Sequence, residues 1–310
     1  MRRQFRFFHR LATAVLLGLG IISIVVLRYS CKDYRSFFLH EKGTLISSED
    51  KEIARDSLTR TSDFILKGSN GLTVRGRLRV PTRGVPPYPA VLVASGIETG
   101  HLVIELLDER PSVIVMAIRY PFDGDVDFSG LKAVSTLIEF RETGMKTIPS
   151  MLLALDYLTA HPDVDTNDVA VATVSFGTFV GVPAAALHPK VHRLIVVQGG
   201  GDISTIVAAN AERLEMPLPR KVSGWLGQLF LFPFEPNRYI ADFSPRQLLM
   251  VNSPGDLLFP DESAKSLYDH AREPKEIIWH KSKHVMPGEL EIVEELTAIV
   301  VRKLYSGQVP

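Results

Sequence analysis

The sequence contains a single cysteine, Cys31, and no excess of either charge. One cysteine excludes an intramolecular disulfide framework and a cysteine-based zinc cluster. The 310 residues include 35 Lys and Arg against 35 Asp and Glu, so the chain lacks the positive field that attracts nucleic acid. These absences argue against a nucleic-acid partner. The remaining composition, 45% hydrophobic, is that of an ordinary globular protein with one substantial core.

One stretch, residues 11–27, has no charged side chain. As a helix that rises ~1.5 Å per residue it would cover ~26 Å, close to the ~30 Å of a bilayer core. It follows a basic segment, 1–10, and the sequence after it, "LRYSCK", has no small-residue cleavage site. The pattern therefore predicts an uncleaved transmembrane signal anchor. Four arginines precede the span, which favours a cytoplasmic N-terminus and a periplasmic or otherwise extracytoplasmic domain.

The polar segment 28–62 is predicted to be a tether between the anchor and the domain. Within it, "SSEDKEIARDSL" indicates a helix start, with Ser47 or Ser48 as the N-terminal cap and acidic residues in the first turn. Residues 63–310 are predicted to form the folded domain. The domain opens with "FILKGSNGLTVRGRLRV", whose alternating pattern around "GSNG" predicts an antiparallel hairpin.

Short apolar runs alternate with helical patterns through the rest of the chain, which predicts an α/β fold with a mostly parallel, doubly wound sheet. The last two predicted strands are separated from the earlier ones by an insertion, 203–243. Predicted helices include 147–162 and 289–305. The predicted strands are residues 88–95, 112–118, 168–175, 193–199, 246–253 and 275–280.

Two motifs that could hold a ligand do not meet the requirements for one. The acidic stretch "DVDTNDVA" has Asp168 where a calcium loop needs glycine, and Val174 where it needs a bidentate Glu. The "QGGGD" stretch, 198–202, lacks the Lys-Ser/Thr pair of a phosphate-binding loop. We interpret it as a loop between elements, and we predict no metal and no organic cofactor.

A run of β-branched and small residues, 169–174, leads directly into Ser175. A nucleophile elbow requires a strand, an abrupt turn that strains the serine, and small neighbours. Gly177 is the small residue two positions after the serine, whereas Thr173 occupies the place of the usual first glycine. This pentapeptide alone does not distinguish a nucleophile from a serine that ends a strand.

A serine hydroxyl becomes a strong nucleophile when an imidazole accepts its proton and a carboxylate orients that imidazole. Asp256 follows a predicted strand, at the sheet edge where catalytic groups gather, and is the leading acid, with Asp202 in reserve. Two histidines, His280 and His284, follow the last predicted strand. We favour His284 as the base because it lies within the loop.

From about residue 63 to 305 the chain resembles the α/β-hydrolase superfamily, particularly its dienelactone-hydrolase-like and prolyl-oligopeptidase-like members. The resemblance rests on the order of five blocks: "GSNGLTVRGRLRVP", "PAVLVASG", "LDYLTAHPDVDTNDVAVATVSFG", "NSPGDLLFP" and "KHVMPG". It implies Ser175 as nucleophile, Asp256 as acid and His284 as base. It also implies an oxyanion hole formed by the N–H groups of Phe176 and Ile97.

Some positions depart from the family pattern. Ser95 and Gly96 stand where many relatives have His-Gly, Thr178 replaces a common glycine, and Pro183 falls inside the expected helix. In the insertion, "VSGWLGQLFLFPFEP" is rich in aromatic residues. It is interpreted either as a lid whose Trp225 and Phe230 line an apolar acyl pocket or as plain core packing.

The sequence predicts a membrane-anchored, carboxylesterase-like serine hydrolase that acts on a small-molecule ester through an acyl-enzyme. Two alternatives stay open. One is a peptidase or amidase of the same fold. The other is a catalytically silent α/β-hydrolase domain that serves as a binding module.

Overall fold

The computed structural model describes residues 29, 32–97, 99–107, 112–122, 132–286 and 288–305. The chain divides into two compact units, Met1–Phe37 and Phe38–Pro310. The predicted basic segment and membrane anchor, 1–27, lie outside the described residues. Among the helices that are described, each is too short or too polar to traverse a bilayer.

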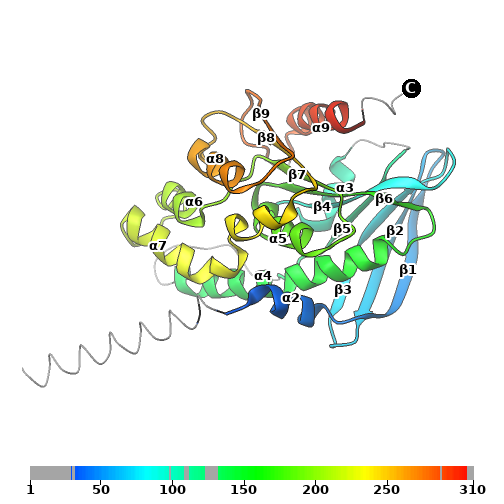
Figure 1. The fold of residues 1–310 in the computed structure, drawn as a ribbon, viewed down its shortest axis with the longest axis horizontal. Coiled ribbons are helices and arrows are strands. Elements are labelled where there is room, and N and C mark those ends of the chain that lie inside the picture. Colours follow the sequence, from blue (N-terminus) through cyan, green and yellow to red (C-terminus); the bar gives the residue numbers. More distant parts are fainter. Residues whose placement is uncertain are drawn as a thin grey trace, which may run out of the picture. The chain divides into compact units, whose positions relative to one another are not determined.

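The larger unit is built on one sheet, in which nine strands of the described residues follow the order β1-β2-β3-β5-β4-β6-β7-β8-β9 (Figure 1). β1, β2, β3 and β5 pair antiparallel in turn, and every pair from β5 through β4 to β9 is parallel. The mostly parallel sheet and its opening hairpin, β2–β3, are therefore confirmed. The strands are β1 (Leu45–Arg55), β2 (Thr59–Gly68), β3 (Thr73–Pro81), β4 (Tyr88–Ala94), β5 (Ile114–Ile118), β6 (Val164–Val174), β7 (Arg193–Val197), β8 (Gln247–Asn252) and β9 (Lys275–Trp279).

Helices cover both faces of the parallel strands, because the strands' apolar side chains point alternately to the two sides. On one face, α9 packs Leu296 against the central strands and α3 packs Val103 against Val93. On the other face, α4 and α5 contact each other and the strands. The helices are α2 (Tyr34–Lys42), α3 (Val103–Leu106), α4 (Lys132–Leu158), α5 (Thr178–Leu187), α6 (Ile203–Asn210), α7 (Arg220–Leu231), α8 (Asp261–His270) and α9 (Leu290–Tyr305).

The structure corrects the prediction of a helix start at "SSEDKEIARDSL", because these residues lie in and just beyond β1. β1 pairs along its length with β2, and nearly all of its residues are exposed. Backbone pairing with β2 therefore outweighs the local helix-capping pattern. The predicted tether, 28–62, includes a strand of the sheet and the start of β2.

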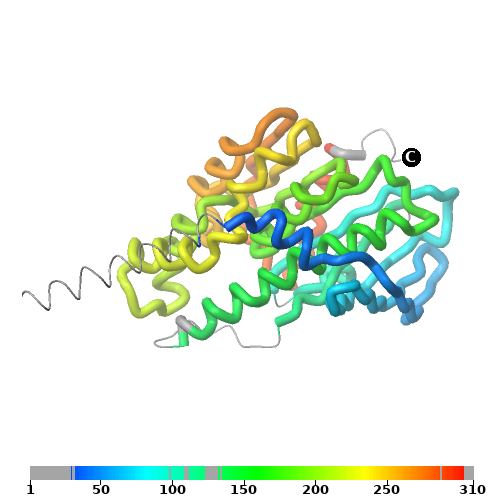
Figure 2. The backbone as a smooth tube through the Cα atoms, turned by 60° about the horizontal axis from the view of Figure 1, so that its bottom comes forward, coloured from blue at the N-terminus to red at the C-terminus, as the bar shows by residue number. Residues whose placement is uncertain are grey.

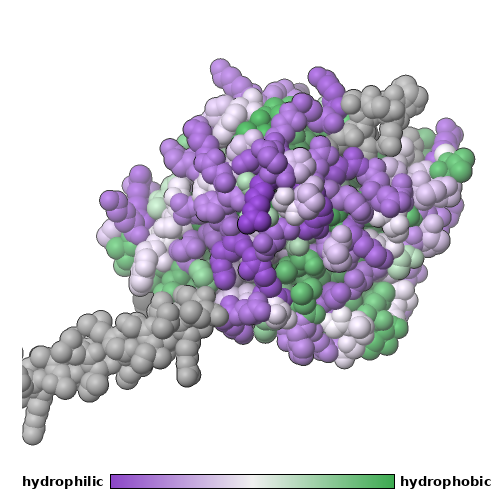
Figure 3. All heavy atoms as spheres, in the orientation of Figure 1, coloured by the Kyte–Doolittle hydropathy of each residue, from purple (hydrophilic) through white to green (hydrophobic). Residues whose placement is uncertain are grey.

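The predicted insertion, 203–243, contains α6, α7 and three short 3-10 helices: η3 (Phe232–Phe234), η4 (Pro236–Arg238) and η5 (Ile240–Phe243). α7 packs closely on α6 at Gly224 and Gly227, where an added Cβ would lie 2.5 Å from Ser204 O and 2.7 Å from Val207 Cγ2. Within the larger unit, the insertion and the β2–β3 hairpin lie at opposite ends (Figure 2). The face seen in Figure 3 is mainly hydrophilic where the residues are described, with small separate apolar groups.

Candidate active site

Ser175 lies at an abrupt turn between β6 and α5. β6 ends at Val174, Ser175 has φ 53°, and the short helix η2 (Ser175–Gly177) leads into α5. A left-handed backbone at a non-glycine residue costs about 1–2 kcal/mol and persists only where the surrounding structure enforces it. A Cβ at Gly177 would lie 2.0 Å from Ala94 O, so only glycine allows the turn to pack against the end of β4. The residue therefore has the strained geometry of a nucleophile elbow.

Glycines elsewhere in the fold make room for the two threonines that depart from the family pattern. A Cβ at Gly181, in α5, would lie 2.3 Å from Thr173 Cγ2. A Cβ at Gly199, just after β7, would lie 2.0 Å from Thr178 Oγ1. Both threonines are fully buried. The larger side chains of Thr173 and Thr178 therefore fit because glycine, which has no side chain, stands at the facing positions 181 and 199.

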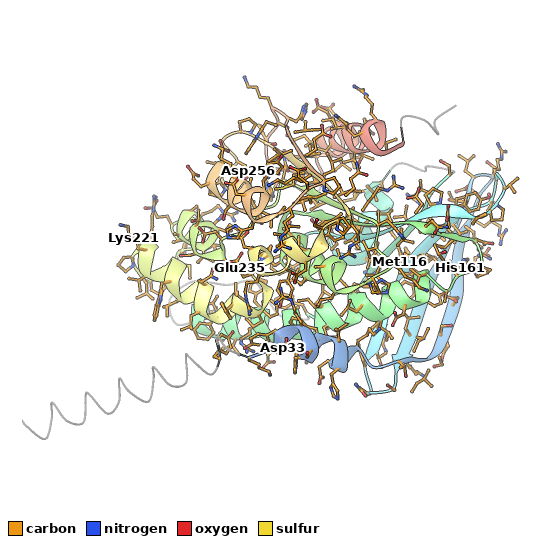
Figure 4. The ribbon with its side chains drawn as sticks, in the orientation of Figure 1. Asp33, Met116, His161, Lys221, Glu235 and Asp256 are labelled. Atoms are coloured by element: carbon orange, nitrogen blue, oxygen red, sulfur yellow. The ribbon has the colours of Figure 1, made fainter. Side chains whose placement is uncertain are left out.

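Asp256 lies in the loop after β8, beside α8 (Figure 4). Its side chain is 1% exposed. The Oδ1 atom accepts hydrogen bonds from the backbone N–H groups of Leu258, at 2.8 Å, and Phe259, at 3.1 Å. The Oδ2 atom lies 2.6 Å from His284 Nδ1. The two amides hold the carboxylate in place and leave its second oxygen for the imidazole.

His284 lies in the loop between β9 and α9 and bridges the other two side chains. Its Nδ1 faces Asp256, and its Nε2 lies 2.8 Å from Ser175 Oγ. Because an ionised carboxylate can only accept, the neutral imidazole donates from Nδ1 and presents Nε2 as an acceptor to the serine hydroxyl. The structure thus brings together the three side chains, far apart in the sequence, that were selected as nucleophile, base and acid.

Aromatic rings surround this constellation. The Phe259 ring stacks on the His284 ring, with centroids 6.0 Å apart and planes inclined by 6°. The stacking limits rotation of the imidazole about its side-chain bonds. Ring contacts at centroid separations of 5.4 to 6.0 Å continue from there past the turn at Ser175. In order, this aromatic row is His284, Phe259, Phe179, Phe176, Phe140 and Phe122.

The residues held as alternatives have other partners. Asp202 is the N-cap of α6, where its carboxylate accepts from Thr205 N at 3.3 Å and from Thr205 Oγ1 at 2.7 Å. His280 Nε2 lies 3.0 Å from a carboxylate oxygen of Glu295 in α9. Neither side chain is part of the hydrogen-bonded relay, so the structure distinguishes them from Asp256 and His284.

The two residues predicted for the oxyanion hole follow neighbouring strands. β4 and β6 pair up to Ala94 and Thr173, so Ile97 and Phe176 follow strand ends at the same edge of the sheet. The Phe176 N–H lies in the first turn of a helical segment, where backbone donors have no intrahelical acceptor. Ile97 lies in the turn after β4. Their role as oxyanion donors stays a prediction.

Hydrogen bonds fix the loop after β4, where Ser95 replaces the histidine of many relatives. The Ser95 hydroxyl donates to Gly100 O at 3.1 Å, and the Tyr120 hydroxyl donates to Ser95 O at 2.8 Å. Tyr120 is buried, and burial raises the pKa of its phenol, so the hydroxyl keeps the proton that it donates. A neutral network thus takes the place of a histidine in this loop.

The two residues predicted to bind substrate lie in α7, which contacts α6 and α4. Trp225 is 59% exposed, and Phe230 is half-buried. Lys221, one turn before Trp225, lies well apart from Asp256 (Figure 4). Contact of either aromatic residue with substrate stays a prediction.

Sequence reasoning did not identify two side chains that contact His284 or its loop. A lone aromatic residue in "DLLFPDE" carries no distinctive pattern, so the sequence does not indicate a role for Phe259. Gln198 was interpreted as part of a glycine-rich connection. Gln198 is a long polar side chain at the end of an apolar strand and is followed by three glycines. This pattern indicates a role near the site only when the strand order is known.

No family profile and no curated protein matches this sequence. Solved structures do match. An acetyl xylan esterase from a Paenibacillus species aligns with a TM-score of 0.64 at 16% identity, over 88% of this chain and 94% of the other. Acetyl xylan esterase 1 from a Thermoanaerobacterium species gives a TM-score of 0.62 at 15% identity, with the same coverage. An α/β hydrolase from a Penicillium species gives 0.51 at 17% identity, over 83% and 99%.

The fold is therefore that of the α/β-hydrolases, as the sequence resemblance indicated. At these identities the likeness establishes the fold alone, because one fold supports many different chemistries.

Proposed function

We propose that this protein is a serine hydrolase that cleaves carboxylic esters through an acyl-enzyme. One observation carries the proposal: Ser175 Oγ, His284 and Asp256 form a continuous relay, with separations of 2.8 Å and 2.6 Å. The strained backbone at Ser175 presents the hydroxyl at the turn. This arrangement activates a hydroxyl for attack on a carbonyl carbon.

In the first half-reaction, His284 Nε2 takes the proton from Ser175 as Oγ attacks the ester carbonyl. The oxyanion that forms accepts hydrogen bonds from the N–H groups of Phe176 and Ile97. Asp256 stays ionised and stabilises the imidazolium. His284 then gives the proton to the leaving alcohol. In the second half-reaction, His284 takes a proton from water as the water oxygen attacks the acyl-enzyme carbonyl, and it returns that proton to Ser175 Oγ as the carboxylic acid leaves.

The fold neighbours support an ester as substrate, because two of them are acetyl xylan esterases. The aromatic row supports an apolar acyl group, since the half-buried rings of Phe176 and Phe179 lie in it next to the nucleophile's turn. The sequence offers Trp225 and Phe230 for the same task. Phe179→Ala and Trp225→Ala distinguish these two sets of residues. In wild type, kcat/KM should rise as the acyl chain of the ester becomes longer. The variant that removes a residue in contact with the acyl chain should show a smaller rise.

We further propose that residues 11–27 anchor the chain in a membrane, with the catalytic unit on the extracytoplasmic side. The support is the charge-free run itself and the arginines that precede it. The substrate would then be an ester that reaches that side of the membrane.

A fluorophosphonate probe tests the activated serine directly. We expect wild type to be labelled under native conditions and Ser175→Ala to remain unlabelled. Absence of wild-type labelling would favour a silent binding module. Hydrolysis of p-nitrophenyl esters, compared with aminoacyl amides, then separates the esterase from a peptidase or amidase. Cleavage of the amides but not of the esters would contradict the ester proposal.

A further inference from the structure

The loop that carries His284 has no regular backbone pairing of its own. Residues 280–286 form neither helix nor strand, and the loop joins β9 to α9. At its start, His280 N donates to Asn252 O at 2.8 Å. A base that must stay within 3 Å of a serine hydroxyl needs firmer support than a free loop gives. Some side chain outside the loop has to provide it.

Gln198 supplies two hydrogen bonds at the peptide groups on either side of His284. Its Nε2 donates to Lys283 O at 2.7 Å, and its Oε1 accepts from Val285 N at 2.6 Å. The first carbonyl belongs to the peptide that enters His284, and the N–H belongs to the peptide that leaves it. A carbonyl only accepts and an N–H only donates, so these contacts also fix which way the Gln198 amide points.

The same amide connects residues 280–286, here called the base loop, to the segment after β8 that carries Asp256. Gln198 Nε2 donates to Ser253 Oγ at 2.7 Å, and Ser253 Oγ lies 2.8 Å from Ser282 Oγ. Ser253 follows β8 directly, three residues before Asp256. Gln198 N donates to Val251 O at 2.8 Å. The side chain is fully buried, so solvent does not compete for these hydrogen bonds.

The backbone at this position would suit a glycine better. Gln198 has φ 46°, in the left-handed region, and three glycines follow it. A bulky residue keeps such a conformation where the surrounding structure requires its side chain. Here the left-handed turn ends β7, between the strand of the elbow and the strand of the acid, and the amide reaches the base loop.

We propose that Gln198 is a positioning residue. By hydrogen bonding to the peptide groups on both sides of His284, it keeps the imidazole within hydrogen-bonding distance of Ser175 and Asp256. The proposal rests on the proposed hydrolase function. Gln198 does not touch the reacting atoms. It acts on the rate of proton transfer through the place and orientation of the imidazole.

Gln198→Met keeps the length of the side chain and removes the hydrogen bonds of its amide. We expect kcat for a p-nitrophenyl ester to fall about 100-fold, because a displacement near 1 Å at a catalytic group has that effect, while KM stays within about threefold. The rate constant of fluorophosphonate labelling falls in parallel. Gln228→Met is the matched control. That glutamine accepts from Ser204 N at 3.1 Å in the insertion, away from the base loop.

Gln198→Glu gives a readout that a purely structural role would not produce. Its carboxylate can accept from Val285 N but cannot donate to Lys283 O, whereas the protonated acid regains one donor. Burial raises the pKa of such a carboxyl. The ratio of kcat in Gln198→Glu to kcat in wild type therefore rises as pH falls.

The outcomes separate the two proposals. If wild type is unlabelled by the probe, the proposed function fails. If wild type is labelled, and folded Gln198→Met retains wild-type kcat or Gln198→Glu shows a pH-independent ratio, the positioning role is overturned and the hydrolase stands. If Gln198→Met does not fold, Gln198→Glu, shown to be folded by circular dichroism, decides by the pH dependence of its kcat ratio.

Discussion

Thr173 shows how a bulky residue can occupy a position where a nucleophile elbow usually has glycine. Its methyl group fills the space that a side chain at position 181 would need, as the 2.3 Å approach of a built Cβ shows. The two positions therefore work as a pair, with one large and one absent side chain. A sequence pattern that considers position 173 alone therefore registers a mismatch with the usual glycine and does not detect the compensating glycine at position 181.

The pair makes a prediction for stability. We expect Gly181→Ala to lower the free energy of unfolding by about 2–3 kcal/mol, because the new methyl group overlaps Thr173 Cγ2 in a fully packed site. In a Thr173→Ser background, which lacks that methyl group, the same change costs about 1 kcal/mol or less. Urea unfolding of both single variants and the double variant measures the coupling. Additive losses would show that the two side chains do not compete for space.

Asp256 provides a prediction for activity. We expect Asp256→Asn to lower kcat by about 10³- to 10⁴-fold, because an amide can donate toward Nδ1 and so favours the wrong imidazole tautomer. Asp261→Asn is the matched control. That carboxylate accepts from Gly255 N at 2.9 Å at the start of α8, outside the relay, and its loss leaves kcat unchanged. Equal kcat in Asp256→Asn and wild type would exclude Asp256 as the acid.

The selection of Ser175, Asp256 and His284 was possible from sequence because each lies just beyond a recognisable apolar strand. Parallel strands end at one edge, so their following loops meet there. Gln198 also follows such a strand, yet its task depends on which strands are neighbours. The placement of β7 between β6 and β8 is a property of strand order, and local sequence does not specify it.

Among the elements, β1 marks the limit of local pattern. "SSEDKEIARDSL" carries a helix cap and acidic residues, and its side chains are almost all exposed in the structure, so no apolar alternation indicates a strand. The segment becomes a strand because β2 offers an unpaired backbone edge. The strands buried on both faces, such as β5 and β7, were predictable because burial imposes continuous apolar runs.

Charged contacts link α4 to the end of α2 and to the residue that follows α5. Asp156, in α4, lies 2.6 Å from Lys42 Nζ and 3.2 Å from His188 Nε2. Burial opposes ionisation of Asp156, but the hydrogen bonds from His188 and Lys42 outweigh it and hold the pKa of this carboxyl below its ordinary value of 3.8. A group with a lowered folded-state pKa stabilises the fold above its unfolded-state pKa and loses that contribution as pH falls through the folded-state pKa.

We therefore expect Asp156→Asn to lower the free energy of unfolding by about 1 kcal/mol at pH 7, a modest value because a third of the side chain is exposed. The difference from wild type shrinks as pH falls below the ordinary pKa of the carboxyl, where both proteins carry a neutral group. Urea unfolding between pH 3 and pH 7 measures it. A difference that is constant with pH would show that the effect is not ionic.

At the scale of the whole molecule, the charge-free run 11–27 leads to a prediction for location. We expect the full chain to remain with membranes after washes in high salt and at alkaline pH, and to be released by detergent. External protease should digest the larger unit in intact spheroplasts if the N-terminus is cytoplasmic. Release by salt alone would contradict a spanning anchor, and protection of the larger unit would reverse the orientation.

The loop that carries His284 begins where β9 ends, and among the described strands β9 is the last in the sheet order, with β8 as its only partner there. A terminal strand opens more readily than a central one. Ser175 follows β6, which is paired on both sides. Mild denaturant should then uncouple the imidazole from an otherwise native elbow. Turnover would cease at concentrations where most of the protein's circular dichroism persists, and dilution would restore it promptly.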